Sequence, residues 1–293
     1  MPSQADSKTA VMPPENSARR RIWLCADDFG ISPAVNTAIR DLIVRDRLNA
    51  TSVMVVTPTF HRSEALPLSM LNIGQRRAAL GLHVTLTAPF RPLSPSYRPV
   101  ADGAFLTIGR MMKLGFLRRL APEALAAEVA TQFKTFADAF GQPPDFVDGH
   151  QHVQLVPQVS EAVLAVTRDL APNAWVRQCG RSVRLARRLA DRKGLVLDLL
   201  SRRFRRLAGA SGLATNPAFA GTYDFDGNRR FGDLFPRFLD DLPDGGVIMC
   251  HPGFVDAELA RLDPLTTRRE QEFAYLASDA FSALLAARGA SLA

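Results

Sequence analysis

The chain has 293 residues, of which 47% are hydrophobic and 22% are charged, and its formal net charge is +7. This composition is typical of a folded globular protein with a sizeable core. No apolar run approaches the roughly 20 residues that span a bilayer, and residues 1–17 lack the apolar stretch of a secretory signal. We therefore expect a disordered leader over residues 1–20 and a single domain over 21–293.

Apolar runs and turn residues alternate along the chain in a strand–helix pattern. We predict strands over 22–26, 51–58, 79–87, 144–155 (running into a turn), 174–178 and 244–253. We predict helices over 33–46, 121–141, 157–170 and 266–287. A Pro-rich loop is expected over 88–104, and basic helices are expected over about 178–212. This alternation favours parallel strands wrapped by helices in one α/β domain. Because polar residues follow at least four strands, we expect a closed or partly closed (β/α) barrel with its active site at the C-terminal strand ends.

Histidine and aspartate gather at these strand ends. Four of the five histidines stand in or just after predicted strands, namely His83, His150, His152 and His251, and the first strand ends in Asp27 and Asp28. One histidine in a strand is usually a core residue, but four in this setting favour a shared site. Adjacent carboxylates repel each other unless a cation or a proton separates their roles. Imidazole and carboxylate groups together suit Zn²⁺ or another divalent ion.

The segment "DGHQH" predicts a second feature of this site. In an extended strand, Asp148, His150 and His152 would share one face. In the simpler alternative, Asp148 only orients a histidine, as carboxylates often do beside a metal. Spacing alone does not decide between His150 and His152 as a ligand.

The three cysteines give little support for covalent catalysis. The spacing of Cys25, Cys179 and Cys250 does not match a metal site, and an odd number of cysteines does not form a complete set of disulfides. This favours a reducing, cytoplasmic location. Cys250 precedes His251, but neighbours on a strand point to opposite faces. We interpret Cys25 and Cys250 as small core residues. The sequence also lacks a G-x-S-x-G turn and a Gly-rich phosphate loop.

Four ordered motifs, "ADDFGIS", "GLHVTLT", "VDGHQHVQLVP" and "MCHPG", resemble the motif set of the YdjC-like carbohydrate deacetylases. The resemblance runs from about residue 21 to the C-terminal helix, and "CADDFGISPAVNTAIRDL" is most similar to the hopanoid-biosynthesis-associated branch. Family members often continue as H-x-H-x-H. This chain departs from that pattern with Gln154.

The resemblance implies a role for each motif residue. Asp28, His83 and His150 would bind one divalent ion, Zn²⁺ or Mg²⁺, Asp27 would be the general base and His251 the general acid. Independently of the resemblance, we expect Asp148, His152 and Arg177 to support the ligands or contact substrate. Arg177 is expected to pair with Asp27 or Asp148, unless it is a surface arginine.

The activity that follows is hydrolysis of an N-acetyl group on an amino sugar, either lipid-linked, such as an N-acetylglucosaminyl hopanoid, or a chitooligosaccharide. A metal hydrolase of an ester or phosphate bond is one alternative. A non-catalytic carbohydrate- or membrane-binding protein is another, although such a protein has no need of an unliganded Asp27 beside the metal.

The positive charge is concentrated in one segment. Residues 177–206 contain 11 Arg or Lys and two Asp, interleaved with leucine and valine. This pattern is typical of a basic amphipathic helix on an anionic membrane surface, and equally of the solvated outer helix of a barrel. We expect peripheral contact with the inner face of the membrane through 178–207. No aromatic platform accompanies the arginines, so no nucleic acid is expected as a partner.

Overall fold

A computed structural model of the chain describes residues 19–98, 100–182, 192–225 and 229–293. The leader predicted over 1–20 and part of the basic segment, 183–191, lie largely outside these residues. Among the described helices, none is long and apolar enough to cross a bilayer.

Parallel strands form the centre of the molecule. The strands are β1 (Arg20–Phe29), β2 (Ala50–Val53), β3 (Ala79–Val84), β6 (Phe146–Gly149), β7 (Trp175–Val176), β8 (Phe219–Ala220), β9 (Val247–Cys250) and β10 (Ala290–Leu292), and a separate antiparallel pair is β4 (Val100–Ala101) with β5 (Ala104–Phe105). Their order in the main sheet is β7-β6-β3-β2-β1-β9-β8, and β10 pairs in parallel with the start of β1. Isolated parallel bridges join Val176 to Thr215 and Arg181 to Phe219. The sheet therefore curves into a partly closed barrel, as predicted.

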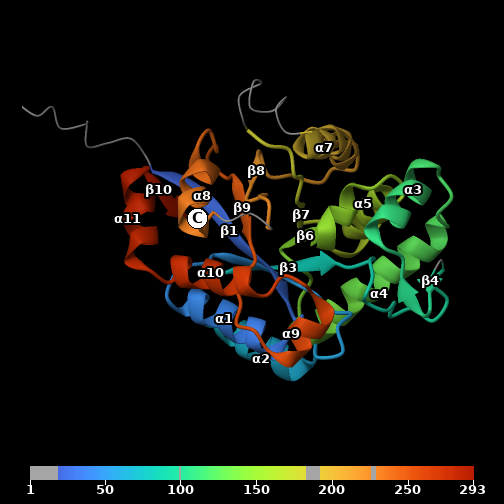
Figure 1. Ribbon diagram of the computed structural model, residues 1–293. Coiled ribbons are helices and arrows are strands. Elements are labelled where there is room, and N and C mark those ends of the chain that lie inside the picture. Colours follow the sequence, from blue (N-terminus) through green and yellow to red (C-terminus); the bar gives the residue numbers. More distant parts are fainter. Residues whose placement is uncertain (1–18, 99, 183–191, 226–228) are drawn as a thin grey trace, which may run out of the picture.

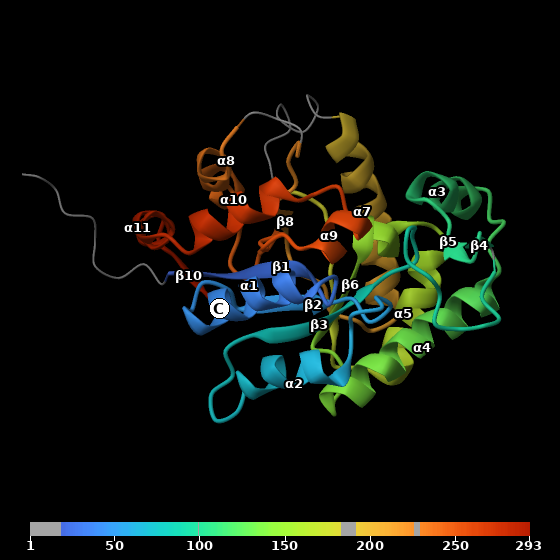
Figure 2. The same cartoon turned by 60° about the horizontal axis from the view of Figure 1, so that its bottom comes forward.

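Helices surround the strands on the outside (Figure 1). They are α1 (Pro33–Val44), α2 (Arg62–Met70), α3 (Ile108–Phe116), α4 (Pro122–Phe140), α5 (Val159–Leu170), α7 (Arg192–Ala210), α8 (Phe231–Leu239), α9 (Ala257–Leu262), α10 (Thr267–Leu276) and α11 (Asp279–Ala287), with a 3₁₀ helix η1 (His150–Leu155). Figure 2 shows α1 and α2 along one side of the strands and α8, α10 and α11 along another.

Local sequence explains where the principal helices begin and end. Ser32 accepts a hydrogen bond from the backbone N–H of Val35 and so caps α1, while Pro33 occupies the first turn. The helix α4 likewise begins at a proline, Pro122, and it ends at Gly141, whose φ of 70° is in the left-handed region. These two helices agree with the sequence prediction to within two residues.

Other predicted elements differ from the structure. The strand predicted over 144–155 ends at Gly149 and continues as η1, and the helix predicted over 266–287 is divided into α10 and α11. The helices α2, α3, α8 and α9 were not predicted, and two of them, α2 and α8, contain an internal proline. Proline usually ends a helix, which explains why the sequence pattern did not indicate these two.

Candidate active site

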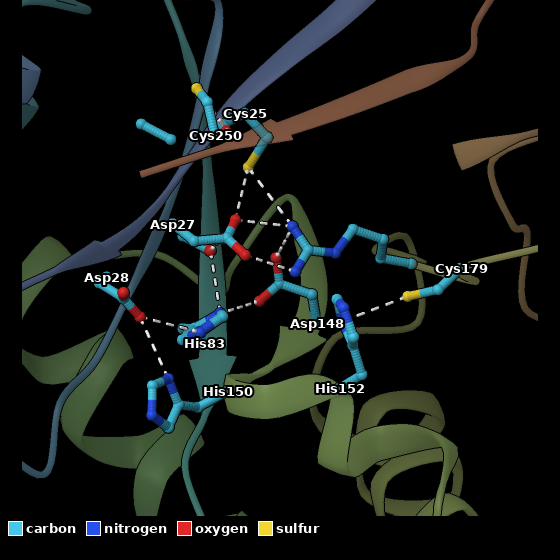
Figure 3. Close-up of polar contacts among 12 residues, drawn as sticks. Cys25, Asp27, Asp28, His83, Asp148, His150, His152, Cys179 and Cys250 are labelled. Carbon is cyan, nitrogen blue, oxygen red and sulfur yellow. Dashed lines mark hydrogen bonds and ion pairs between the residues drawn. The ribbon is translucent and has the colours of Figure 1, made fainter. Parts of the chain in front are cut away.

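Asp27 and Asp28 lie at a bulge near the C-terminal end of β1. The register between β1 and β2 shifts between Ala26 and Phe29, and Asp28 has a φ of 69°. Gly30 follows with a φ of 99°, and a Cβ there would lie 2.5 Å from the carbonyl oxygen of Met54. The bulge breaks the strict alternation of strand side chains. It lets the two neighbouring carboxylates enter one cavity while each keeps its own partners (Figure 3).

Asp28 faces two imidazoles from other strands (Figure 3). Its Oδ1 lies 3.2 Å from Nε2 of His83 on β3 and 3.2 Å from Nδ1 of His150 at the start of η1. One ligand atom from each of these three residues lies within 4.8 Å of the others. Two imidazole nitrogens and one carboxylate oxygen converging in this way fit a divalent ion such as Zn²⁺, with positions left open for other ligands.

The second oxygen of Asp28 is held by an arginine of helix α10. Arg269 on α10 donates from Nη2 to Asp28 Oδ2 at 2.6 Å and to Asp263 Oδ2 at 2.6 Å, and from Nε to the carbonyl of Leu265. Burial alone would raise the pKa of Asp28, but the Arg269 charge and the two histidines hold it well below its usual range. Asp28 is therefore ionised, with Oδ1 directed at the imidazoles.

His83 is oriented by a carboxylate behind it. Its Nδ1 lies 2.6 Å from Oδ1 of Asp148, which is fully buried on β6. Burial alone would lower the pKa of His83, but Asp148 and Asp28 raise it to about 10. With Nδ1 engaged, Nε2 is the atom left to bind a metal, an arrangement common among metal-ligating histidines.

Asp27 belongs to a different network from Asp28. Arg177, which is fully buried, donates from Nη1 to Asp27 Oδ1 at 2.7 Å and from Nη2 to Oδ2 at 2.6 Å, and Nη1 also lies 2.8 Å from Asp148. The Ser52 hydroxyl donates to Asp27 Oδ1 at 3.2 Å. Burial opposes ionisation of Asp27, but Arg177 holds its pKa well below the usual range. Within the described residues, Oδ2 accepts only the Arg177 bond, which leaves it a lone pair for a proton.

His251 directly follows β9, the strand that pairs with β1. Its backbone N–H donates to Oε2 of Glu272 at 2.5 Å, and its ring lies edge-on to Phe225 with centroids 5.6 Å apart. Nδ1 has no hydrogen-bond partner among the described residues. Glu272 also accepts from the Tyr223 hydroxyl at 2.6 Å, so it ties the end of β9 to the loop after β8.

These groups open into one cavity of about 680 Å³. Of the predicted site residues, Asp27, Asp28, His83, His150, His152 and His251 line it, whereas Asp148 and Arg177 lie behind the lining. Phe90 comes from the Pro-rich loop, and a continuous wall comes from residues 262–268. The volume is in the range of small-ligand sites.

The prediction that Asp148, His150 and His152 share one face is wrong. Gln151 and His152 have φ values of 54° and 58°, so the chain turns immediately after His150. Nδ1 of His152 lies 3.5 Å from Sγ of Cys179, away from the His83–His150 pair (Figure 3). The alternation of side chains in an extended strand therefore does not apply to these residues. Of the two histidines, only His150 contacts the carboxylate of Asp28.

Burial keeps the thiols of the cysteines protonated, including that of Cys179, which contacts His152. All three are free and buried, and burial raises the pKa of Cys179 to about 12. Cys25, Asp27 and Asp148 also lie close enough together to be a candidate metal group. The guanidinium of Arg177 contacts both of those carboxylates, however, and supplies their counter-charge without an ion.

Sequence reasoning missed three residues of the site: Ser52, Arg269 and Glu272. Ser52 lies 3.0 Å from His83 Nδ1 as well as contacting Asp27. Arg269 and Glu272 lie on α10, in the charged stretch "TTRREQE", where the pattern indicates a solvated helix. Both are fully buried instead. Two buried charged residues in an otherwise polar helix carry no sequence signal, because their partners are far away along the chain.

The partly closed parallel barrel therefore brings carboxylates and imidazoles from separate strands together in a group that could hold a divalent ion. The chain belongs to the YdjC-like protein family, whose model matches residues 21–287. It is similar to the chitooligosaccharide deacetylase of Proteus mirabilis (strain HI4320), with 25% identity over 91% of this chain and 94% of that protein. It is also 28% identical to the chitooligosaccharide deacetylase of Klebsiella pneumoniae (strain 342), over 90% of this chain and 93% of that protein.

A solved structure shows the same fold. The crystal structure of a candidate cellobiose-phosphate cleavage protein from Enterococcus faecalis V583 matches with a TM-score of 0.73 and 21% identity, covering 94% of this chain and 97% of that one.

Proposed function

We propose that this protein is a metal-dependent deacetylase that hydrolyses the N-acetyl group of an amino sugar. The observation that carries the proposal is that two adjacent aspartates have different partners. Asp28 joins His83 and His150 as a ligand set, while Asp27 lies beside that set but is held by Arg177. A binding protein would have no use for a separate ionised carboxylate at this point. The family membership and the names of the relatives support the same class of reaction.

A divalent ion held by Asp28, His83 and His150 would supply positive charge that polarises an acetyl carbonyl and favours deprotonation of water. Asp27 would take the proton of the attacking water through Oδ2, the oxygen with a spare lone pair. The bidentate contact with Arg177 keeps Asp27 ionised and fixes its plane.

Collapse of the tetrahedral intermediate requires a proton on the departing nitrogen, since an amide anion is a poor leaving group. His251 also lines the cavity and would give that proton as the general acid. Glu272 holds the backbone at His251, and Phe225 packs against its ring. The two proton-transfer groups therefore come from β1 and β9, neighbouring strands of the barrel.

The cavity lining supports a substrate with both polar and apolar parts. Its inner end carries the aspartates and histidines, and its walls carry Phe90, Phe225, Leu262 and Leu265. We propose a lipid-linked amino sugar, such as an N-acetylglucosaminyl hopanoid, as the substrate. The names of the relatives favour a second candidate, a chitooligosaccharide.

Acetate release from both kinds of substrate tests the proposal. Asp27→Asn should bind metal normally yet lower kcat by about 10²- to 10⁴-fold, because it removes the proton acceptor. Asp28→Asn should lose both metal and activity. Asp138→Asn, on the exposed side of α4, is the matched control and should behave as wild type. Undiminished acetate release by the Asp28 variant would refute the mechanism, and release from an ester or phosphate substrate alone would change the bond assigned.

A further inference from the structure

The helix α7 has a second apolar face that the barrel does not use. Its core-facing side is formed by Ser201, Phe204 and Ala208, which are buried. On the solvent side, Val196 is 49% exposed and Leu199 is 68% exposed. An outer barrel helix needs only one apolar stripe, facing the core. Val196 and Leu199 therefore require another explanation.

A neighbouring segment extends this apolar surface. Phe116, the last residue of α3, is 54% exposed and lines a surface groove together with Leu199 and Leu200 of α7. The next residue, Leu117, is 52% exposed. Figures 1 and 2 both show α3 and α7 at the same end of the molecule, beside α5. Two segments far apart in sequence thus present exposed apolar side chains to the same groove.

Unpaired arginines surround the apolar residues. Arg202, Arg205 and Arg206 line the groove, are exposed and have no ion pair within the described part of the chain. The nearby acid, Glu161 on α5, is already neutralised by two arginines, at 3.0 Å from Arg118 and 2.7 Å from Arg203. The groove therefore has a strong net positive charge next to its apolar side chains.

We propose that this α3–α7 surface, made by Phe116, Leu117, Val196, Leu199, Arg202, Arg205 and Arg206, docks on an anionic lipid bilayer. Basic residues at the rim would pair with anionic headgroups while the apolar side chains enter the headgroup boundary. A second copy of the chain fits poorly, since a two-fold contact would bring like-charged arginines together. A nucleic acid would use the arginines but gains little from Leu117, Val196 and Leu199, because its bases stack on aromatic rings.

Vesicle co-sedimentation tests this proposal with the full chain. Binding should be clear with vesicles that contain phosphatidylglycerol, weak with pure phosphatidylcholine vesicles, and reduced by high salt. The triple variant Arg202→Gln/Arg205→Gln/Arg206→Gln should lower the partition coefficient about 100-fold, since each basic residue near an anionic surface contributes about fivefold. Phe116→Ser/Leu199→Ser should weaken binding while keeping the preference for anionic lipid.

The matched control is Arg62→Gln/Arg229→Gln/Arg237→Gln, which removes the same charge from exposed arginines elsewhere on the molecule. It should bind vesicles as wild type does. Equal loss in both triple variants would mean that only net charge matters and would overturn the proposal. So would equal binding to both lipid compositions, or binding to duplex DNA without binding to vesicles. The readout is independent of acetate release, so the deacetylase proposal and this one can fail separately.

Discussion

Arg269 on α10 and Asp28 on β1 form a buried ion pair in which Nη2 lies 2.6 Å from Oδ2. The same nitrogen holds Asp263, and Nε holds the carbonyl of Leu265, two residues of the cavity wall. One guanidinium therefore connects a proposed metal ligand to the wall that faces the substrate.

Arg269→Lys should separate the geometric role of this arginine from its charge. A lysine keeps the charge but cannot reach Asp28, Asp263 and the carbonyl of Leu265 together. We expect metal affinity to fall about 10- to 100-fold, the usual cost of losing a group that orients a ligand. Competition with a chromophoric chelator measures the affinity. The control is Arg261→Lys, because Arg261 is exposed and pairs with Glu258 on the surface. Equal affinities in the two variants would contradict this role for Arg269.

Metal binding should release a proton and become tighter as pH rises. Burial alone would lower the pKa of His83, but its carboxylate neighbours raise it to about 10, so at neutral pH the metal-free imidazole is charged. A metal binds only the neutral imidazole and must displace that proton. Between about pH 7 and pH 9 we therefore expect apparent affinity to increase about tenfold per pH unit.

Calorimetry in buffers with different ionisation enthalpies would count this proton directly. About one proton per bound metal is expected from His83 in wild type. The Asp148→Asn variant should release fewer protons per bound metal at pH 9, because loss of the carboxylate 2.6 Å from Nδ1 lowers the pKa of His83. Metal binding that is independent of pH across this range would show that His83 is neutral beforehand.

The strand–helix alternation predicted a barrel of parallel strands, because buried strands such as β3 and β9 are short, mainly apolar segments followed by polar or turn residues. It also located Asp27, Asp28, His83 and His150 at strand ends. The turn at Gln151 and His152 was not predictable from the pattern, since neither residue is a glycine that would indicate a left-handed backbone.

The partners of the site residues were harder to predict than the residues themselves. Arg269 is 241 positions from Asp28, and Arg177 is 150 positions from Asp27. A charged side chain in a sequence looks the same whether it is solvated or paired in the core. Arg177 could be proposed as a partner because it ends a predicted strand, whereas Arg269 lies within a polar helix and gave no such indication.

Arg177 should be a major source of stability as well as a site residue. Arg177→Met would leave Asp27 and Asp148 buried without their counter-charge, which should destabilise the fold by about 3–5 kcal/mol. Because the pKa of Asp27 is depressed in the folded protein, its contribution is fully present above about pH 4 and is lost as pH falls further. Urea unfolding at several pH values measures both effects.

The stability difference between Arg177→Met and wild type should therefore narrow below pH 4. Arg118→Met, which breaks an exposed pair with Glu161, is the control and should leave the unfolding midpoint unchanged. A constant difference down to strongly acidic pH would mean that packing of the arginine, rather than its charge, stabilises the protein.

The three thiols should be inert in the folded protein. Burial raises the pKa of Cys179 to about 12 and also raises those of Cys25 and Cys250, while a thiolate is the form that reacts with iodoacetamide. Mass spectrometry should find no alkylation under native conditions and three labelled cysteines after unfolding in guanidinium. Cys250→Ala, next to His251, should keep acetate release close to wild type. Rapid native labelling that abolishes activity would instead point to a nucleophilic thiol and against hydrolysis assisted by Asp27.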